Sequence, residues 1–139
     1  MLLAPDQKLR LPSKPENILL VERLIEDVCE VFSIGEEKFG NILISVTEAV
    51  NNAIHHGNKS NPDKNFDVAF KTTPKDITFI IKDEGIGFDY NNLPDPTAPE
   101  NLEKDSGRGV FLMKRLADKI EFNDGGRAIA LSFSIFPLL

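Results

Sequence analysis

The stretch Thr47-Glu48-Ala49-Val50-Asn51-Asn52-Ala53-Ile54-His55-His56-Gly57 decides the fold, because it predicts an amphipathic helix with a polar edge. At about 100° per residue its apolar residues fall within one arc. Glu48, Asn52 and His56 follow one another at four-residue steps along the flank of that arc. Gly57 is a natural helix stop. The helix therefore carries a polar row along the border of its buried face.

Two interpretations of this polar row stay open on the residues alone. Polar pairs four residues apart are common on solvated helix edges. The functional alternative is that Asn52 offers a neutral amide oxygen to Mg²⁺, while Glu48, one turn away, accepts a proton from an attacking hydroxyl. For His55 and His56, next to Gly57, capping of the helix end is a better explanation than catalysis or metal binding.

Regular elements are predicted on both sides of this helix. A capping box with Ser13 as N-cap and Glu16 three residues later starts an earlier helix. From Glu84 to Ser106 apolar periodicity is lost and prolines interrupt the chain. The expected order is an edge strand at 7–11, helices at 14–32 and 34–57, a hairpin at 66–70 and 77–81, a long loop, a helix at 110–117, and strands at 119–123 and 127–136.

This order predicts an α/β (α+β) fold. Strand pairs joined by short turns favour a mixed, mostly antiparallel sheet with helices packed on one face, a two-layer sandwich. At 139 residues the chain has the size of one domain, so we expect a single domain over 1–139. The proline-rich loop is expected to form a nucleotide lid at about 89–106, mobile without nucleotide and ordered around it.

The second motif, Asp83-Glu84-Gly85-Ile86-Gly87, directly follows the apolar strand predicted at 77–81. Glycines allow the sharp turn that the chain makes there. A carboxylate at this strand end can accept a hydrogen bond from the exocyclic amine of adenine, which selects adenine over guanine. By itself the motif is better explained as an ordinary turn of Asp and Gly residues.

The third motif, Gly107-Arg108-Gly109, ends the proline-rich loop and opens a helix. Free backbone amides and the positive end of the helix dipole at such a start suit a phosphate chain. The alternative is a flexible junction. Neither a P-loop nor the glycine-rich dinucleotide fingerprint occurs in the sequence.

Composition excludes several classes of function. The net charge is −6, which disfavours sequence-independent binding to nucleic acid or to an anionic membrane. The single cysteine, Cys29, has no internal disulfide partner and is expected in the core. No apolar run is long enough for a membrane span or a signal peptide, so a cytoplasmic protein is expected.

In order and in context, the three motifs resemble those of the Bergerat-fold (GHKL) ATPases, whose fold is histidine-kinase-like. Within that superfamily the chain is most similar to the bacterial anti-sigma-factor serine/threonine-protein kinases. The likeness is carried by residues 47–57, 83–88 and 106–113 and extends over nearly the whole chain. A preceding phospho-acceptor hairpin and a following domain are lacking in the sequence, which favours this family over sensor histidine kinases and the large topoisomerases and chaperones.

The resemblance implies binding of ATP and Mg²⁺ and transfer of the γ-phosphoryl group to a serine or threonine of an anti-anti-sigma (STAS) protein. It also implies sequestration of a sigma factor by a homodimer. Glu48 then corresponds to the catalytic base and Asn52 to the Mg²⁺ ligand. The nucleotide-binding residues implied are Asn52, Asp83, Gly85, Gly87, Gly107, Arg108, Gly109 and Val110.

Where many relatives place a threonine near the adenine, this chain has Gly126-Arg127-Ala128. At these positions the chain has no hydroxyl group for a secondary contact to the base. Two other functions remain as alternatives to the kinase: an ATP-binding module that switches protein partners without efficient phosphoryl transfer, and a plain structural domain. The ATP motifs serve the kinase and the switching module equally, whereas Glu48 favours the kinase.

Overall fold

The computed structural model describes residues 8–87 and 108–135. The elements in chain order are β1 (Lys8–Pro12), the 3-10 turn η1 (Pro15–Asn17), α1 (Ile18–Val31), α2 (Glu36–Asn52), the π-helical turn η2 (Ala53–Gly57), β2 (Asn65–Thr72), β3 (Asp76–Lys82), α3 (Arg108–Leu116), β4 (Lys119–Asn123), the 3-10 turn η4 (Asp124–Gly126) and β5 (Ala128–Ser134). Each helix and strand expected from the sequence is present within a few residues of its expected position.

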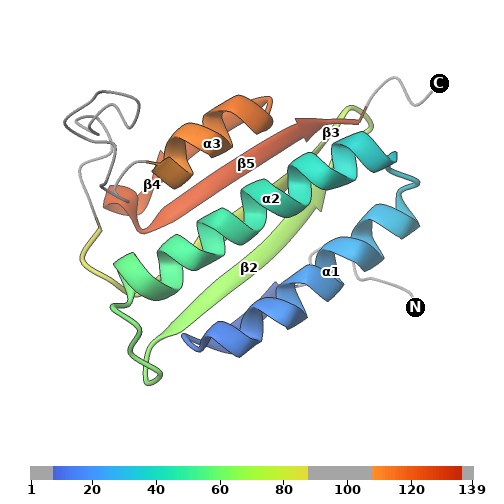
Figure 1. Ribbon diagram of the computed structural model, residues 1–139. Helices are drawn as coiled ribbons and strands as arrows, with labels where there is room; N and C mark the ends of the chain where they lie inside the picture. Colours follow the sequence, from blue (N-terminus) through green and yellow to red (C-terminus); the bar gives the residue numbers. More distant parts are fainter. Residues whose placement is uncertain (1–7, 88–107, 136–139) are drawn as a thin grey trace.

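The five strands form one sheet in the order β1-β2-β3-β5-β4. All neighbouring pairs of described strands are antiparallel. The helices cover one face of this sheet, with α2 across its middle, α1 on one side and α3 on the other (Figure 1). The expected two-layer α+β sandwich is confirmed, with a sheet that is antiparallel rather than mixed in its described part.

The core lies between the sheet and the helices. In β2 and β3 every second side chain is buried, and the same alternation brings Leu131 and Phe133 of β5 to the same layer. Ile42, Val46 and Val50 of α2 are fully buried against them. Burial of side chains of this size contributes roughly 1.5–3 kcal/mol each. The hydrophobic spacing in the sequence therefore fixes which side of α2 faces the sheet.

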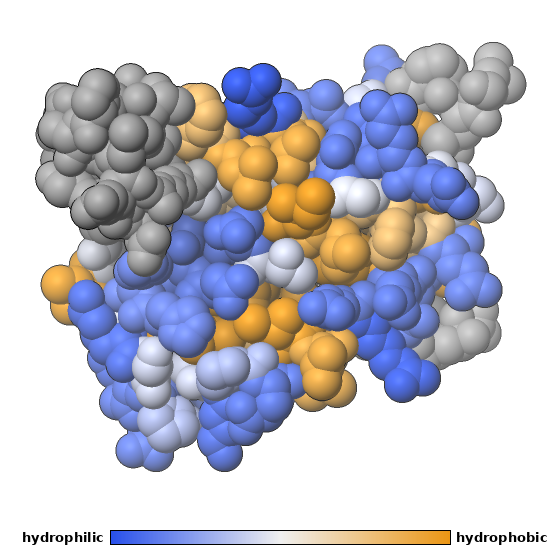
Figure 2. Space-filling model, in the orientation of Figure 1, coloured by the Kyte–Doolittle hydropathy of each residue, from blue (hydrophilic) through white to orange (hydrophobic). Residues whose placement is uncertain are grey.

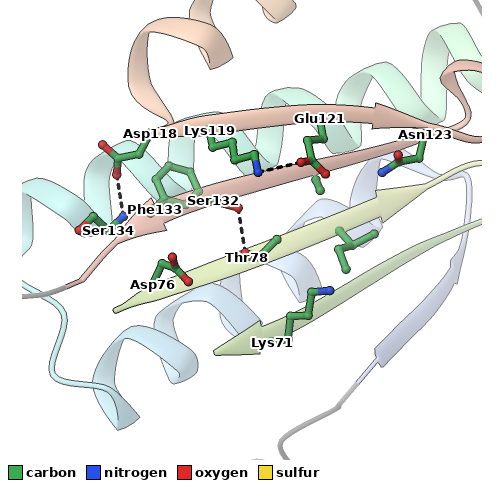
Figure 3. Close-up of a pocket in the computed structure, with 12 residues that line it drawn as sticks. Lys71, Asp76, Thr78, Asp118, Lys119, Glu121, Asn123, Ser132, Phe133 and Ser134 are labelled. Atoms are coloured by element: carbon green, nitrogen blue, oxygen red, sulfur yellow. Dashed lines mark hydrogen bonds and ion pairs between the residues drawn. The ribbon is translucent and has the colours of Figure 1, made fainter. Parts of the chain in front are cut away.

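The opposite face of the sheet carries small and charged side chains. A shallow pocket of about 420 Å³ lies there over β3, β5 and β4. Figure 3 shows Thr78 paired with Ser132, and Lys119 with Glu121, on this face away from the helices. The pocket includes none of the site residues expected from the sequence.

The start of the first helix differs from the expectation. Ser13 does not cap α1: its hydroxyl donates to the carbonyl of Lys64 at 2.8 Å, and Lys14 precedes the short turn η1. Ser13 is only 2% exposed, because β1 ends beside the start of β2 and buries the hydroxyl there. Tertiary pairing thus overrides the local capping signal. None of the described helices is long and apolar enough to cross a membrane.

Candidate nucleotide-binding site

The polar row of α2 meets the start of α3. Glu48 and Asn52 are both partly buried, and both lie against the α-carbon of Gly109. A β-carbon placed on Gly109 would be 2.8 Å from Glu48 Oε2 and 3.0 Å from Asn52 Nδ2. The absence of a side chain at Gly109 therefore allows both polar groups to reach the beginning of α3.

The beginning of α3 provides backbone donors. The helix starts at Arg108, so the amide groups of its first turn have no partner within the helix. Val110 is 7% exposed and packs into the core, which leaves its backbone amide as the group available for a ligand. Gly107 and the lid expected at 89–106 lie outside the described residues. An anion placed before α3 would meet these amides, the helix dipole and the side chain of Asn52.

At its C-terminal end α2 changes into the π-helical turn η2, which ends at Gly57. The chain there lies directly under the turn that follows β3. A β-carbon on Gly57 would overlap the carboxylate of Asp83, and one on Gly85 would overlap the carbonyl of Gly57. Two chain segments distant in sequence are therefore in close contact, which the lack of a side chain at Gly57 and at Gly85 allows.

Asp83 lies at the end of β3 and is about half buried. Its backbone amide donates to the carbonyl of Arg127 at 2.9 Å, and its Oδ1 accepts a hydrogen bond from the amide of Gly85 at 2.8 Å. Burial raises the pKa of Asp83, while the Gly85 hydrogen bond and the charge of Arg127 act in the opposite direction. Gly87 has a φ of +84°, which closes the turn in a conformation that favours glycine.

One continuous helical segment joins the two halves of the site. Glu48 and Asn52 face the start of α3, and Gly57 further along lies under Asp83. Gly57 follows Glu48 by nine positions in the chain, which corresponds to roughly 13 Å along a helix axis. The structure therefore brings Glu48, Asn52, Asp83, Gly85 and Gly109 together along the C-terminal part of one helical segment, with the start of α3 beside Glu48 and Asn52 and the turn after β3 beside Gly57.

Comparison with known proteins decides the family. A sequence model of the histidine kinase-like ATPase domain matches residues 11–133. The chain belongs to this family. Its expected membership of the Bergerat-fold ATPases is thus confirmed, and the matched region contains all of the motifs on which that expectation rested.

Curated relatives carry a more specific name. Over 123 residues the chain is 26% identical to the serine-protein kinase RsbW of Oceanobacillus iheyensis, covering 84% of this chain and 78% of the relative. It is also 26% identical, over 133 residues, to the serine-protein kinase RsbW of Staphylococcus aureus strain JH9, covering 90% and 84% of the two chains. These names agree with the kinase function expected from the sequence.

A solved structure shares the fold. The crystal structure of the RsbU and RsbW domains of a Mycobacterium tuberculosis protein matches 94% of this chain with a TM-score of 0.62 and 11% sequence identity. The match spans 31% of that longer chain. At this level of identity the likeness concerns the fold of the ATPase domain.

A Mg²⁺ ion that is bound together with a nucleotide requires few protein ligands. Among the described residues there is no group of three or more His, Cys, Asp or Glu side chains that could hold a metal by itself. Mg²⁺ in nucleotide sites is usually bound through one or two protein oxygens together with phosphates and water. The side chain of Asn52 carries one such oxygen and lies next to the start of α3, so it fits a Mg²⁺ ion that would be bound together with a nucleotide.

Three residues of the site were not identified from the sequence. Gly57 was expected only as a helix stop, and Asn58 was not singled out. Arg127 was noted only where a threonine was expected, and the structure shows its Nε donating to the carbonyl of Gly85 at 2.7 Å. Their partners lie 26 to 42 residues away in the chain, so no local sequence pattern predicts these contacts.

Proposed function

We propose that this chain is an ATP-dependent serine/threonine-protein kinase of the anti-sigma-factor type that phosphorylates an anti-anti-sigma (STAS) protein. One observation carries the proposal: a carboxylate, Glu48, and an amide, Asn52, both face the start of α3, and the same helical segment contacts Asp83 at Gly57, a few residues further along. That arrangement separates a base-binding end from a phosphate-binding end. The names of the RsbW relatives support the same conclusion.

ATP is bound along the C-terminal part of this segment, from the turn beside Gly57 to the start of α3. Asp83 accepts a hydrogen bond from the exocyclic amine of adenine, with Gly85 and Gly87 shaping the turn beside the base. The amides at 107–110 surround the phosphates. Asn52 holds Mg²⁺, which when bound neutralises charge on the phosphate oxygens.

Glu48 acts as the general base. It accepts the proton of a serine or threonine hydroxyl as that oxygen bonds to the γ-phosphorus, and the bond from the γ-phosphorus to the bridging oxygen of ADP breaks. The acceptor residue leaves as a phosphoester and ADP is released. Proton acceptance by a positioned side chain typically contributes about 10²- to 10⁴-fold in rate.

The protein substrate docks on the helical side of the molecule. Apolar side chains gather in the middle of this side, over α2 and adjoining parts of α1 and α3 (Figure 2). Ile44 is 45% exposed and precedes Glu48 by one helical turn, and Phe111 of α3 is 38% exposed. An exposed apolar surface beside the general base supports docking of a folded protein rather than a small acceptor.

An exchange of protein partners follows from the resemblance to the anti-sigma-factor kinases. The chain sequesters a sigma factor as a homodimer in the cytoplasm and releases it when the STAS protein competes for the helical side. Light scattering coupled to size exclusion checks the dimer, with a single-chain mass as the outcome that contradicts it.

An ATP-binding module that switches partners without phosphoryl transfer is the second candidate, because it needs every ATP contact but not Glu48. The two are separated by incubating the protein and a co-encoded STAS protein with radiolabelled Mg-ATP. We expect transfer by the wild type, a loss of at least about 100-fold in Glu48→Ala, and ATP affinity within a few-fold of wild type.

Glu37→Gln provides the matched control, because Glu37 is exposed in the first turn of the same helix. It should transfer at the wild-type rate. Equal transfer by Glu48→Ala and wild type would show that the base is assigned wrongly, and absence of transfer in the wild type with normal ATP binding would favour the switching module.

A further inference from the structure

The turn at residues 83–87, here called the base turn, is held from two sides by residues outside the sequence motifs. On one side stands Asn58, which is fully buried. Its Oδ1 accepts a hydrogen bond from the amide of Glu84 at 2.8 Å, and its Nδ2 donates to Ser13 Oγ and to the carbonyl of Asn65. This side of the base turn is therefore anchored in the buried junction of β1, η2 and β2.

On the other side stands Arg127, between η4 and β5. Its Nε donates to the carbonyl of Gly85 at 2.7 Å, and its Nη1 donates to the carbonyl of Asp124 at 3.1 Å. The guanidinium thus connects the base turn to the neighbouring turn η4. A second close approach supports the connection, because a β-carbon on Gly87 would overlap the carbonyl of Gly125.

The two hydrogen bonds of Gly85 link Arg127 to Asp83. Arg127 binds the carbonyl oxygen of Gly85, and Asp83 Oδ1 accepts from the amide of the same residue. The turn's own hydrogen bond therefore occupies Oδ1 rather than Oδ2 of Asp83. A carboxylate fixed in this way presents its other oxygen in one orientation, which a flat base requires.

We propose that Arg127 is a positioning residue for recognition of the base: by donating from Nε to the carbonyl of Gly85, it fixes the orientation of Asp83 toward the exocyclic amine of adenine. The inference rests on the proposed function, in which Asp83 makes that contact. The charge of Arg127 adds to the effect, since it opposes the rise in the pKa of Asp83 that burial causes.

Three substitutions of Arg127 separate the effect of the hydrogen bond from that of packing. Arg127→Gln places an amide nitrogen at the same number of bonds from the backbone as Nε and so keeps a donor there. Arg127→Met fills similar space without a donor, and Arg127→Ala is a second donor-free variant in case methionine crowds the turn. The readout is the ratio of the Kd for purine riboside triphosphate, which lacks the 6-amino group, to the Kd for ATP, each measured with Mg²⁺ by calorimetry.

For the wild type we expect a ratio of about 10 or more, as one hydrogen bond to a charged group gives. Arg127→Met and Arg127→Ala should reduce the ratio to within about threefold of 1, while Arg127→Gln restores most of it. Lys82→Met is the matched control. The Lys82 side chain is about half exposed and pairs with the Oδ2 of Asp124 at 3.4 Å, so its loss removes a cation next to η4 without touching the base turn.

The results distinguish the two proposals. A wild type that binds both nucleotides equally overturns the contact of Asp83 with adenine, and the role of Arg127 with it. A wild type that discriminates, together with an unchanged ratio in both donor-free variants, overturns the role of Arg127 alone. Equal ratios in Arg127→Gln and Arg127→Met also overturn it, because the donor then has no part in the recognition.

Discussion

The backbone of Gly57 lies so close to the carboxylate of Asp83 that a β-carbon on Gly57 would overlap it. Gly57 ends the helical segment that carries Glu48 and Asn52, whereas Asp83 directly follows β3. The contact therefore sets the position of the turn at residues 83–87 relative to Glu48 and Asn52.

Gly57→Ala should weaken ATP binding by about tenfold or more, since the new methyl group displaces the Asp83 carboxylate. The φ of Gly57 is not positive, so alanine causes no backbone strain and the fold should persist. Calorimetric titration with Mg-ATP measures the loss. Gly40→Ala on α2 is the control, because a β-carbon there meets open space. An unchanged Kd in Gly57→Ala would contradict the close packing of Gly57 against Asp83.

Gly109→Ala should reduce phosphoryl transfer while preserving stability. The new β-carbon approaches the ends of the flexible side chains of Glu48 and Asn52, which are able to move away. Alanine also favours a helix over glycine by about 1 kcal/mol. We expect a melting temperature equal to or above wild type and a kcat at least about tenfold lower. A kcat equal to that of wild type would mean that these side chains do not act from the positions described.

ATP affinity should fall as the pH decreases. The fall should begin at a higher pH than it would if Asp83 had the ordinary pKa of an aspartate. Burial raises the pKa of Asp83, with Asp124 acting in the same direction and Gly85, Arg127 and Lys64 opposing it. An acid with a raised pKa in the folded state takes up its proton earlier as pH falls, and the protonated group is a poorer acceptor for the adenine amine.

The linked effect on stability has the opposite sign. Since protonation of Asp83 is easier in the folded state than in the unfolded state, it favours the folded state as pH falls through the raised pKa. Asp83→Asn should therefore bind ATP weakly with no loss of stability at neutral pH, and the wild-type minus Asp83→Asn difference in binding free energy should shrink on acidification. Parallel pH profiles for the two proteins would show that another group titrates.

Cys29 should resist alkylation in the native protein. Its side chain is 5% exposed, and burial raises its pKa to about 11. At neutral pH the reactive thiolate is then a very small fraction of the thiol. Iodoacetamide labelling followed by mass spectrometry should be slow for the native protein and fast in denaturant. Fast native labelling would place Cys29 outside the core formed by α1, α2 and the sheet.

The sequence by itself determined the elements and the family. The helical spacing around Glu48 and Asn52, the apolar strands on either side of 74–76, and the glycines of the three motifs are local signals, because they reflect the backbone periods of helix and strand. They predicted the two-layer sandwich and the nucleotide-binding motifs in their order. The prediction of a capping box at Ser13 was wrong, because the Ser13 hydroxyl donates to the carbonyl of Lys64 instead.

Only the tertiary structure decided how the motifs fit together. The contact of Gly57 with Asp83, the burial of Asn58 under Glu84 and the hydrogen bond from Arg127 to Gly85 join residues that lie 26 to 42 positions apart. Each depends on the register of the antiparallel sheet and on the packing of α2 against it, and these arise from the whole core. A local sequence pattern reflects the period of a helix or a strand and so predicts that element. A contact between distant segments forms only when the sheet and the helices have packed together.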